Sequence, residues 1–199
     1  GTEMTIPGPE DLLCVGDRVT VIMPSGRARA VRRIFRDVEE GAESVVIAGG
    51  GTTAYMLAQT MESRGVAVTL IEGARERCDA LSRLLSTTRI IHGDATRLSV
   101  LAEERVGDAD VFVALCGNDE VNLMSSLQAK QMGVAHIVVA VNRADYAPLV
   151  ERVGINHAVS PRILTGNSIL TLAGGSNIRS MALLQDGKAE VVELTAEPN

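Results

Sequence analysis

Aromatic residues are nearly missing from this sequence, which has no Trp, two Tyr and two Phe among its 199 residues. A protein that binds single-stranded nucleic acid by stacking bases on aromatic side chains is therefore not expected. Basic residues are also few, with 19 Lys and Arg against 25 Asp and Glu and a formal net charge of −6. Phosphate neutralisation needs clustered positive charge, so we do not expect a general nucleic-acid-binding protein.

Cysteines and long apolar runs are scarce as well. The three cysteines, Cys14, Cys78 and Cys116, are widely spaced and form no Cys-x-x-Cys pair, which favours reduced thiols over a disulfide or zinc framework. Apolar runs such as Val66–Ile71 and Ile137–Val141 are far shorter than the ~20 residues of a membrane-spanning helix. We expect an acidic, soluble protein whose 46% hydrophobic residues form a core.

What the sequence does contain is a regular alternation of short Val- and Ile-rich runs with segments of helical period. This alternation is typical of strand–helix–strand units, and runs that are apolar throughout are typical of a sheet covered on both faces. The predicted strands are Val45–Ala48, Val66–Ile71, Arg89–Ile91, Val111–Leu115, Ile137–Val141 and a short His157–Val159. We therefore predict an α/β fold with a Rossmann-like, doubly wound parallel sheet.

Segments between these strands have helical periodicity. Apolar residues three and four positions apart predict helices over Thr52–Arg64, Glu76–Leu85 and Glu120–Met132.

The N-terminal residues depart from this rhythm. Leu12–Val15 and Arg18–Met23 flank a Gly-Asp turn and predict an antiparallel strand pair, and Gly26–Arg36 predicts a basic amphipathic helix.

The C-terminal residues also depart from it. A predicted helix, Ile163–Ala173, leads to a second hairpin of Ile178–Leu184 and Glu190–Leu194. We expect three parts: residues 1–40 as the tail of a small β-rich lobe, 41–165 as the Rossmann-type nucleotide-binding domain, and 166–199 as a linker helix and the start of a second small β-rich lobe. Both flanks are expected to belong to modules of a longer protein.

A glycine-rich turn joins the first predicted strand to the first helix and matches G-x-G-x-x-G/A in its expected context. The first glycine permits the tight turn, and the next motif glycine lets the backbone approach a pyrophosphate. The helix N-terminus offers free N–H donors to the anion. The residues of this motif are Gly49, Gly50, Gly51, Thr52, Thr53 and Ala54. The alternative is a tight strand-to-helix turn without a ligand.

Glu72 ends the second predicted strand, where the dinucleotide pattern places an acid that holds the adenosine ribose hydroxyls. Its carboxylate would repel a 2′-phosphate, so we expect NAD rather than NADP. A solvated residue at a strand end is the alternative.

Two further loops follow strands and so belong to the same edge of the sheet. Asp94 and the backbone of Ala95 are predicted to face the adenine. The alternative is that Asp94 caps the helix that begins near Leu98, and both roles could coexist. The backbone of Cys116 and Gly117 is predicted to face the pyrophosphate and the nearer ribose. We interpret Asp119 as the cap of the next helix rather than as a ligand group.

These residues together resemble the regulator-of-potassium-conductance (RCK) nucleotide-binding domains, most closely those of the Trk-type potassium uptake regulators. The matching stretches, in family order, are Ile47–Gly51, Leu70–Glu72, Arg77, Leu81, His92–Thr96, Ala114–Leu115, Asp119–Glu120, Asn122, Ala129–Lys130, Asn142–Arg143, Tyr146, Gly154–Ile155 and Ser160–Pro161. Each motif alone is common, and the ordered set is specific. Cys116 departs from the family, which has a small hydroxyl residue there.

The resemblance implies a cytoplasmic, nucleotide-sensing regulatory subunit that binds NAD, NADH, ATP or ADP. It implies a homo-oligomer, a dimer or tetramer, that is peripheral on the inner face of the membrane and gates a separate Trk-type potassium-translocating subunit. It also implies that the β-rich flanks are lobes that follow each Rossmann lobe.

Two other functions are kept as alternatives, an NAD-dependent oxidoreductase and a regulator of another cation transporter. None of His92, His136 and His157 belongs to a recognisable catalytic pair, and no separate substrate domain fits in the remaining residues. We therefore expect no enzymatic activity, no catalytic residue and no metal site.

An apolar surplus on two segments predicts a dimer interface, because large exposed apolar patches usually mark partner sites. The residues concerned are Met124, Leu127, Met132, Leu149 and Val150. Completion of the monomer core by the same residues is the alternative.

Overall fold

A computed structural model describes residues 6–14, 19, 21, 42–155, 157–173, 178–184 and 189–194. The chain separates into two compact units, Glu40–Leu164 and the combination of Gly1–Glu39 with Thr165–Asn199. Within the described ranges, every helix is too short or too polar to span a bilayer.

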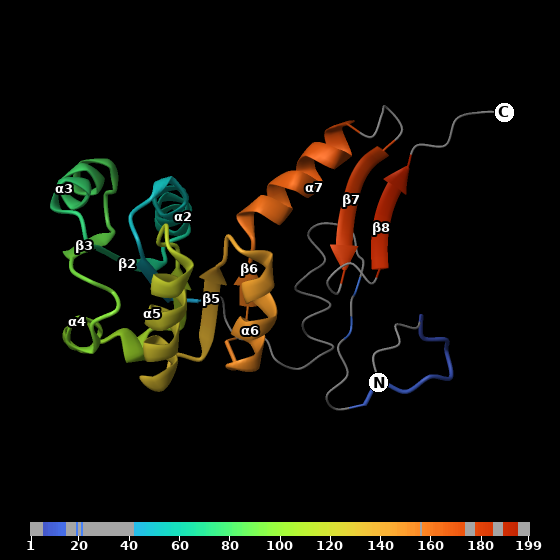
Figure 1. Cartoon of the computed structure of the whole chain (residues 1–199), viewed down its shortest axis with the longest axis horizontal. Coiled ribbons are helices and arrows are strands. Elements are labelled where there is room, and N and C mark those ends of the chain that lie inside the picture. Colours follow the sequence, from blue (N-terminus) through green and yellow to red (C-terminus); the bar gives the residue numbers. More distant parts are fainter. Residues whose placement is uncertain are drawn as a thin grey trace. The chain divides into compact units, whose positions relative to one another are not determined.

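The unit Glu40–Leu164 is built on a six-stranded sheet in the order β3-β2-β1-β4-β5-β6, and all neighbouring strands are parallel. Figure 1 labels β3, β2, β5 and β6 of this sheet. The strands are β1 (Ser44–Ala48), β2 (Ala67–Glu72), β3 (Arg89–His92), β4 (Val111–Ala114), β5 (His136–Ala140) and β6 (His157–Val159). Each strand ends within one residue of its predicted position. The predicted doubly wound, Rossmann-like sheet is confirmed.

Helices and short 3₁₀ turns connect these strands. They are α2 (Thr52–Ser63), α3 (Arg75–Leu84), α4 (Leu98–Glu103), η1 (Val106–Asp108), α5 (Asp119–Gln131), η2 (Ala144–Tyr146) and α6 (Ala147–Arg152), and α7 (Pro161–Ala173) follows β6. The three helices predicted from periodicity are α2, α3 and α5.

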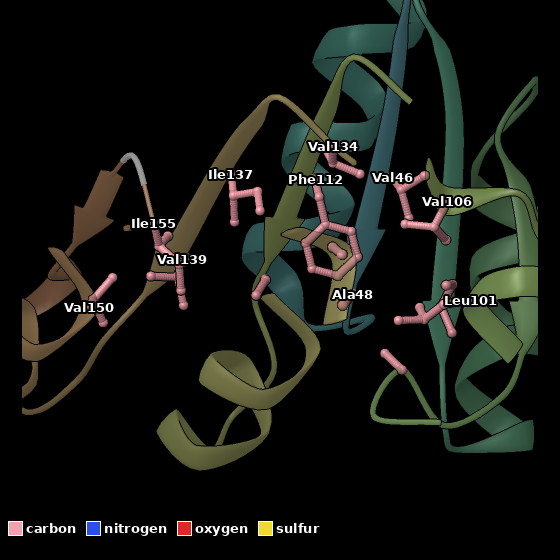
Figure 2. Packing of buried hydrophobic residues seen from close by; sticks show 14 of the residues in the cluster. Val46, Ala48, Leu101, Val106, Phe112, Val134, Ile137, Val139, Val150 and Ile155 are labelled. Atoms are coloured by element: carbon pink, nitrogen blue, oxygen red, sulfur yellow. The ribbon is translucent and has the colours of Figure 1, made fainter. Parts of the chain in front are cut away.

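Alternate residues of β1 enter two different hydrophobic clusters, which shows that helices cover both faces of the sheet. Val45 and Ile47 pack in the cluster that contains Ala54 and Ala58 of α2 and Leu81 of α3. The opposite cluster, shown in Figure 2, combines residues of β1, β4 and β5 with α4, α5 and α6. Its labelled members include Val46, Ala48, Leu101, Phe112, Ile137, Val139 and Val150. Burial on both faces is why β1 is apolar from Val45 to Ala48.

The C-terminal hairpin is present as predicted. Strands β7 (Ile178–Leu184) and β8 (Ala189–Leu194) form an antiparallel two-stranded sheet.

The N-terminal prediction is wrong where the structure tests it. Residues 12–14 are irregular rather than part of a strand, and Leu12 and Leu13 are exposed. The predicted helix Gly26–Arg36 lies outside the described residues.

The predicted apolar surplus is smaller than expected. Val150 is fully buried, and Leu127 and Met132 pack against the cluster of Figure 2, so these three residues complete the core. Met124 and Leu149 remain exposed, at 50% and 45%.

Candidate functional site

The carboxyl ends of the parallel strands bring the predicted site residues to one edge of the sheet. Ala48 of β1 lies in register with Ile71 of β2 and with Ala114 of β4, and Glu72 lies in register with His92 of β3. The loops that contain Asp94, Glu72, Gly49 and Cys116 therefore lie at this edge, in the strand order β3, β2, β1 and β4.

Gly49 is a glycine that the chain itself requires. Its φ is +100°, a left-handed conformation that strongly favours glycine. A Cβ at this position would lie 2.8 Å from the backbone nitrogen of Cys116 and from the carbonyl oxygen of Leu115. The Gly49 N–H also donates to the carbonyl of Ile71 at 2.8 Å, so the turn is fixed against both neighbouring strands.

The Glu72 carboxylate joins the first turn to the second. One oxygen, Oε2, accepts the N–H of Gly50 at 2.6 Å, and the other, Oε1, accepts the N–H of Ala74 at 2.7 Å. A Cβ on Gly50 would lie 2.8 Å from the same Oε2 atom. Gly50 thus leaves the space that the Glu72 side chain occupies.

Gly51 differs from these two glycines because nothing in the protein fills the space beside it. Its φ of −68° and ψ of 177° are accessible to any residue, and a Cβ would meet no atom within 4 Å. Gly51 is the N-cap of α2, where no side chain caps the helix and no acidic residue lies in the first turn. Thr52 and Thr53 are exposed, and the first N–H groups of a helix have no partner within the helix.

Ala54, the last residue of the motif, is fully buried between α2 and the sheet. A small residue at this position lets α2 pack closely against the sheet.

The Asp94 loop follows β3. Asp94 Oδ1 accepts the N–H of Thr96 at 2.9 Å and its hydroxyl at 2.7 Å, and these hydrogen bonds lower the pKa of Asp94. The N-cap of α4 is Arg97, without a side-chain cap, so Asp94 does not cap this helix. Asp94 is exposed and Ala95 is buried in the cluster of Figure 2.

The loop after β4 is held by Asn122, which is fully buried on α5. Asn122 Oδ1 accepts the N–H of Cys116 at 2.7 Å, while Nδ2 donates to the carbonyls of Cys116 at 2.9 Å and Ala140 at 3.0 Å. Both the N–H and the carbonyl of Cys116 are therefore hydrogen-bonded to Asn122. Of the two residues predicted here, Gly117 keeps the open backbone, because a Cβ there would meet nothing within 4 Å.

The interpretation of Asp119 as a helix cap is wrong. Asn118 is the N-cap of α5, and its Oδ1 accepts the N–H of Val121 at 2.9 Å. The Asp119 carboxylate instead accepts the N–H groups of Asn142 and Arg143 and the Asn142 amide at 2.9–3.0 Å. Burial raises the pKa of Asp119, and these hydrogen bonds outweigh it, so the pKa lies below its ordinary value.

The negative charges of Glu72 and Asp94 affect the pKa of the Cys116 thiol. Burial, with the negative charges of Glu72 and Asp94, raises the pKa of Cys116 to about 11. This thiol is protonated at neutral pH, which makes it a poor nucleophile.

The histidines do not form a catalytic group with these residues. His92 lies at the carboxyl edge, where its Nε2 contacts the carbonyl of Gly73 at 3.0 Å. His136 and His157 begin β5 and β6, at the opposite edge of the sheet. In the part of the chain that the structure describes, no three His, Cys, Asp or Glu side chains gather as a metal site would require.

Sequence reasoning missed the part that Asn122 plays. The available signal was a large polar residue at a core-facing position of a predicted helix, since a buried amide must be hydrogen-bonded.

The sequence matches the model of the TrkA-N domain over residues 45–161. The Trk system potassium uptake protein TrkA homolog 2 of Methanosarcina mazei is 34% identical over 198 residues, 98% of this chain and 44% of that protein. The Trk system potassium uptake protein TrkA of Halomonas elongata is 37% identical over 191 residues, 96% of this chain and 42% of that protein. The chain thus spans less than half the length of these curated relatives.

Solved structures share the fold. The TrkA-N domain of the inner membrane protein ybaL from Escherichia coli is 16% identical with a TM-score of 0.60, over 67% of this chain and 98% of that one. The GsuK channel bound to NAD is 20% identical with a TM-score of 0.61, over 80% of this chain and 29% of that one. The Shewanella denitrificans Kef CTD in AMP-bound form is 21% identical with a TM-score of 0.54, over 67% and 83%.

Proposed function

Because this chain belongs to the TrkA-N domain family, we propose that residues 45–161 bind an adenine nucleotide at the carboxyl edge of the sheet. The proposed ligands are NAD and NADH, with ATP or ADP as alternatives. Solved neighbours of the same fold that are bound to NAD and to AMP support this choice of ligand class.

The observation that carries the proposal is the empty space at Gly51. The uncapped N-terminus of α2 offers N–H donors and a positive helix-dipole end, and the missing Cβ lets a phosphate approach the backbone. Gly50, Gly51, Thr52 and Thr53 are the proposed phosphate-binding residues.

Glu72 is proposed to receive the adenosine ribose. A carboxylate has about four lone-pair sites, and the Gly50 and Ala74 N–H groups use only two. The ribose hydroxyls can therefore donate to Glu72 while both turns stay in place. A negative charge at this position also supports NAD over NADP.

The loops on either side complete the proposed site. Asp94 and Ala95 would border the adenine after β3, and the segment Cys116–Gly117 would border the second half of a dinucleotide after β4. Gly117 offers the backbone for this contact, because the Cys116 amide and carbonyl already have partners.

For the whole protein we propose a regulatory role rather than catalysis. The relatives are named as potassium uptake proteins, which supports a cytoplasmic, homo-oligomeric subunit at the inner face of the membrane that gates a potassium-translocating partner. A regulator of another cation transporter and an NAD-dependent oxidoreductase are the competing functions.

Calorimetric titration of the chain with NAD, NADH, ATP, ADP and NADPH tests the ligand class. We expect binding of the first four and weaker binding of NADPH. Gly51→Val should abolish all binding, since its side chain fills the phosphate space. Gly166→Val is the matched control, because a Cβ at Gly166 on α7 also meets nothing within 4 Å. Retained affinity in a folded Gly51→Val variant would place the ligand elsewhere.

The competing enzyme function has its own measurement. Incubation with NADH and a panel of carbonyl compounds should give no loss of absorbance at the NADH band, and steady turnover would favour the oxidoreductase.

A further inference from the structure

The first turn of α5 carries two buried polar side chains on one helix face. Asp119 is 6% exposed and Asn122 is 0% exposed, and residues three apart lie on the same side of a helix. A buried carboxylate or a buried amide destabilises the folded protein unless its hydrogen-bonding groups have partners. Both side chains form their hydrogen bonds with loops of the carboxyl edge rather than with their own helix.

Asn122 holds the end of β4 to the end of β5. Its amide uses both protons and one oxygen lone pair on the Cys116 N–H, the Cys116 carbonyl and the Ala140 carbonyl. The backbone leaving β4 toward Gly117 is thereby fixed.

Asp119 holds the next loop in the same manner. It receives three donors, the N–H groups of Asn142 and Arg143 and the side-chain amide of Asn142. Together the two side chains fix the loops after β4 and after β5.

The strand order separates these loops from the adenosine half of the proposed site. A sheet of order 3-2-1-4-5-6 consists of two mononucleotide-binding halves that meet between β1 and β4. Gly49, Glu72 and Asp94 belong to the β1–β3 half. Asn122 and Asp119 bond only to the β4–β5 half.

Resting on the function proposed above, we propose that Asn122 and Asp119 are positioning residues for the second nucleotide of a dinucleotide. They do not touch the ligand. They hold the two loops against which that second half lies, and so set the affinity for NADH relative to AMP, which occupies only the adenosine half.

The test is the ratio of NADH to AMP affinity, measured by calorimetry on the full chain. Asn122→Ser leaves the Cys116 N–H, the Cys116 carbonyl and the Ala140 carbonyl without their present partner. Asp119→Asn replaces one accepting oxygen with an NH₂ group, which cannot accept from the N–H groups of Asn142 and Arg143. Each variant should weaken NADH binding by about ten-fold more than AMP binding, the scale of one lost buried hydrogen bond. A cooperative thermal unfolding transition is the criterion that each variant is folded.

Glu62→Gln is the matched control for a merely structural effect. Glu62 also binds backbone N–H groups of a distant loop, those of Ser86, Thr87 and Thr88, but on the β1–β3 half. We expect it to lower stability without changing the NADH to AMP ratio.

The outcomes separate this inference from the proposed function. Equal losses of NADH and AMP affinity in Asn122→Ser and Asp119→Asn, or no loss, would overturn the positioning role alone. A parent chain that binds neither nucleotide would overturn both proposals. A selective loss of NADH in either folded variant supports the inference.

Discussion

Glu72 serves both the fold and the proposed ligand. Its two carboxylate oxygens hold the N–H groups of Gly50 and Ala74, so the side chain is already oriented across the glycine turn before any ribose arrives. An acceptor that is held in advance loses little conformational freedom when it binds.

Replacing Glu72 with Gln should weaken NAD, NADH, ATP and ADP together by about 1–3 kcal/mol, the scale of a charge-assisted hydrogen bond lost. The fold should persist, because the replacement has the same size and can still accept one of the two backbone N–H groups. Titration calorimetry measures the loss, and a Glu72→Gln chain that binds NAD as tightly as the parent would contradict the assignment.

The Cys116 thiol reports on the same carboxylate. Its pKa of about 11 predicts slow alkylation by iodoacetamide at pH 7–8 and a rise in rate toward pH 11. Glu72→Gln removes one of the negative charges that oppose the thiolate, so the pKa of Cys116 should fall and the rate profile should move to lower pH. Peptide mass spectrometry after timed alkylation follows Cys116 separately from Cys78. A profile that does not move would mean that Glu72 lies too far from the thiol to act on it.

At the scale of elements, each end of α2 adjoins a loop of the sheet. Its N-terminus lies at the glycine turn, and Glu62 near its C-terminus accepts the N–H groups of Ser86, Thr87 and Thr88 and the Thr88 hydroxyl. Burial raises the pKa of Glu62, but these hydrogen bonds outweigh it and lower the pKa from 4.5 to about 2.

This depressed pKa predicts a pH-dependent contribution to stability. The carboxylate contribution is fully present above about pH 4.5 and is lost as the pH falls toward 2, because protonation removes the negative charge that strengthens these hydrogen bonds. Glu62→Gln should therefore unfold at lower urea concentration than the parent at pH 7, with a smaller difference at pH 3. Urea unfolding at both pH values measures this, and a difference that grows on acidification would contradict it.

The sequence predicted the elements well because the signal is local. A strand buried on both faces, such as β1, is apolar at consecutive positions, here Val45–Ala48, and α2, α3 and α5 repeat apolar residues every three or four positions. The cap of α5 was misassigned because Asn118 and Asp119 are adjacent and both suit an N-cap. Only the fold brings Asn142 to Asp119, 23 residues away, and Ser86–Thr88 to Glu62. Hydrogen bonds between side chains and segments distant in the sequence leave no local sequence pattern, so they could not be predicted.

At the scale of the whole molecule, the remaining exposed apolar side chains on α5 and α6 bear on assembly. With Leu127, Met132 and Val150 in the core, the proposed self-association rests on Met124 and Leu149. Light scattering should report a dimer or larger species at micromolar concentration, and Leu149→Asp should reduce it to a monomer with an unchanged nucleotide site. Leu127→Asp would not test this interface, since it would place a charge against the hydrophobic core. A strictly monomeric parent, with and without NADH, would exclude this interface.

The glycines of the carboxyl edge also predict how freely the sequence can vary. A library that randomises residues 49, 51 and 117 and is selected only for folding should retain Gly at 49, because backbone atoms lie where any Cβ would go. Positions 51 and 117 should accept many residues under that selection, since the protein leaves their space empty. Selection for NADH binding should then remove the larger side chains at 51 and 117. Sequencing before and after the second selection would distinguish the glycine that the fold demands from those that only a ligand can demand.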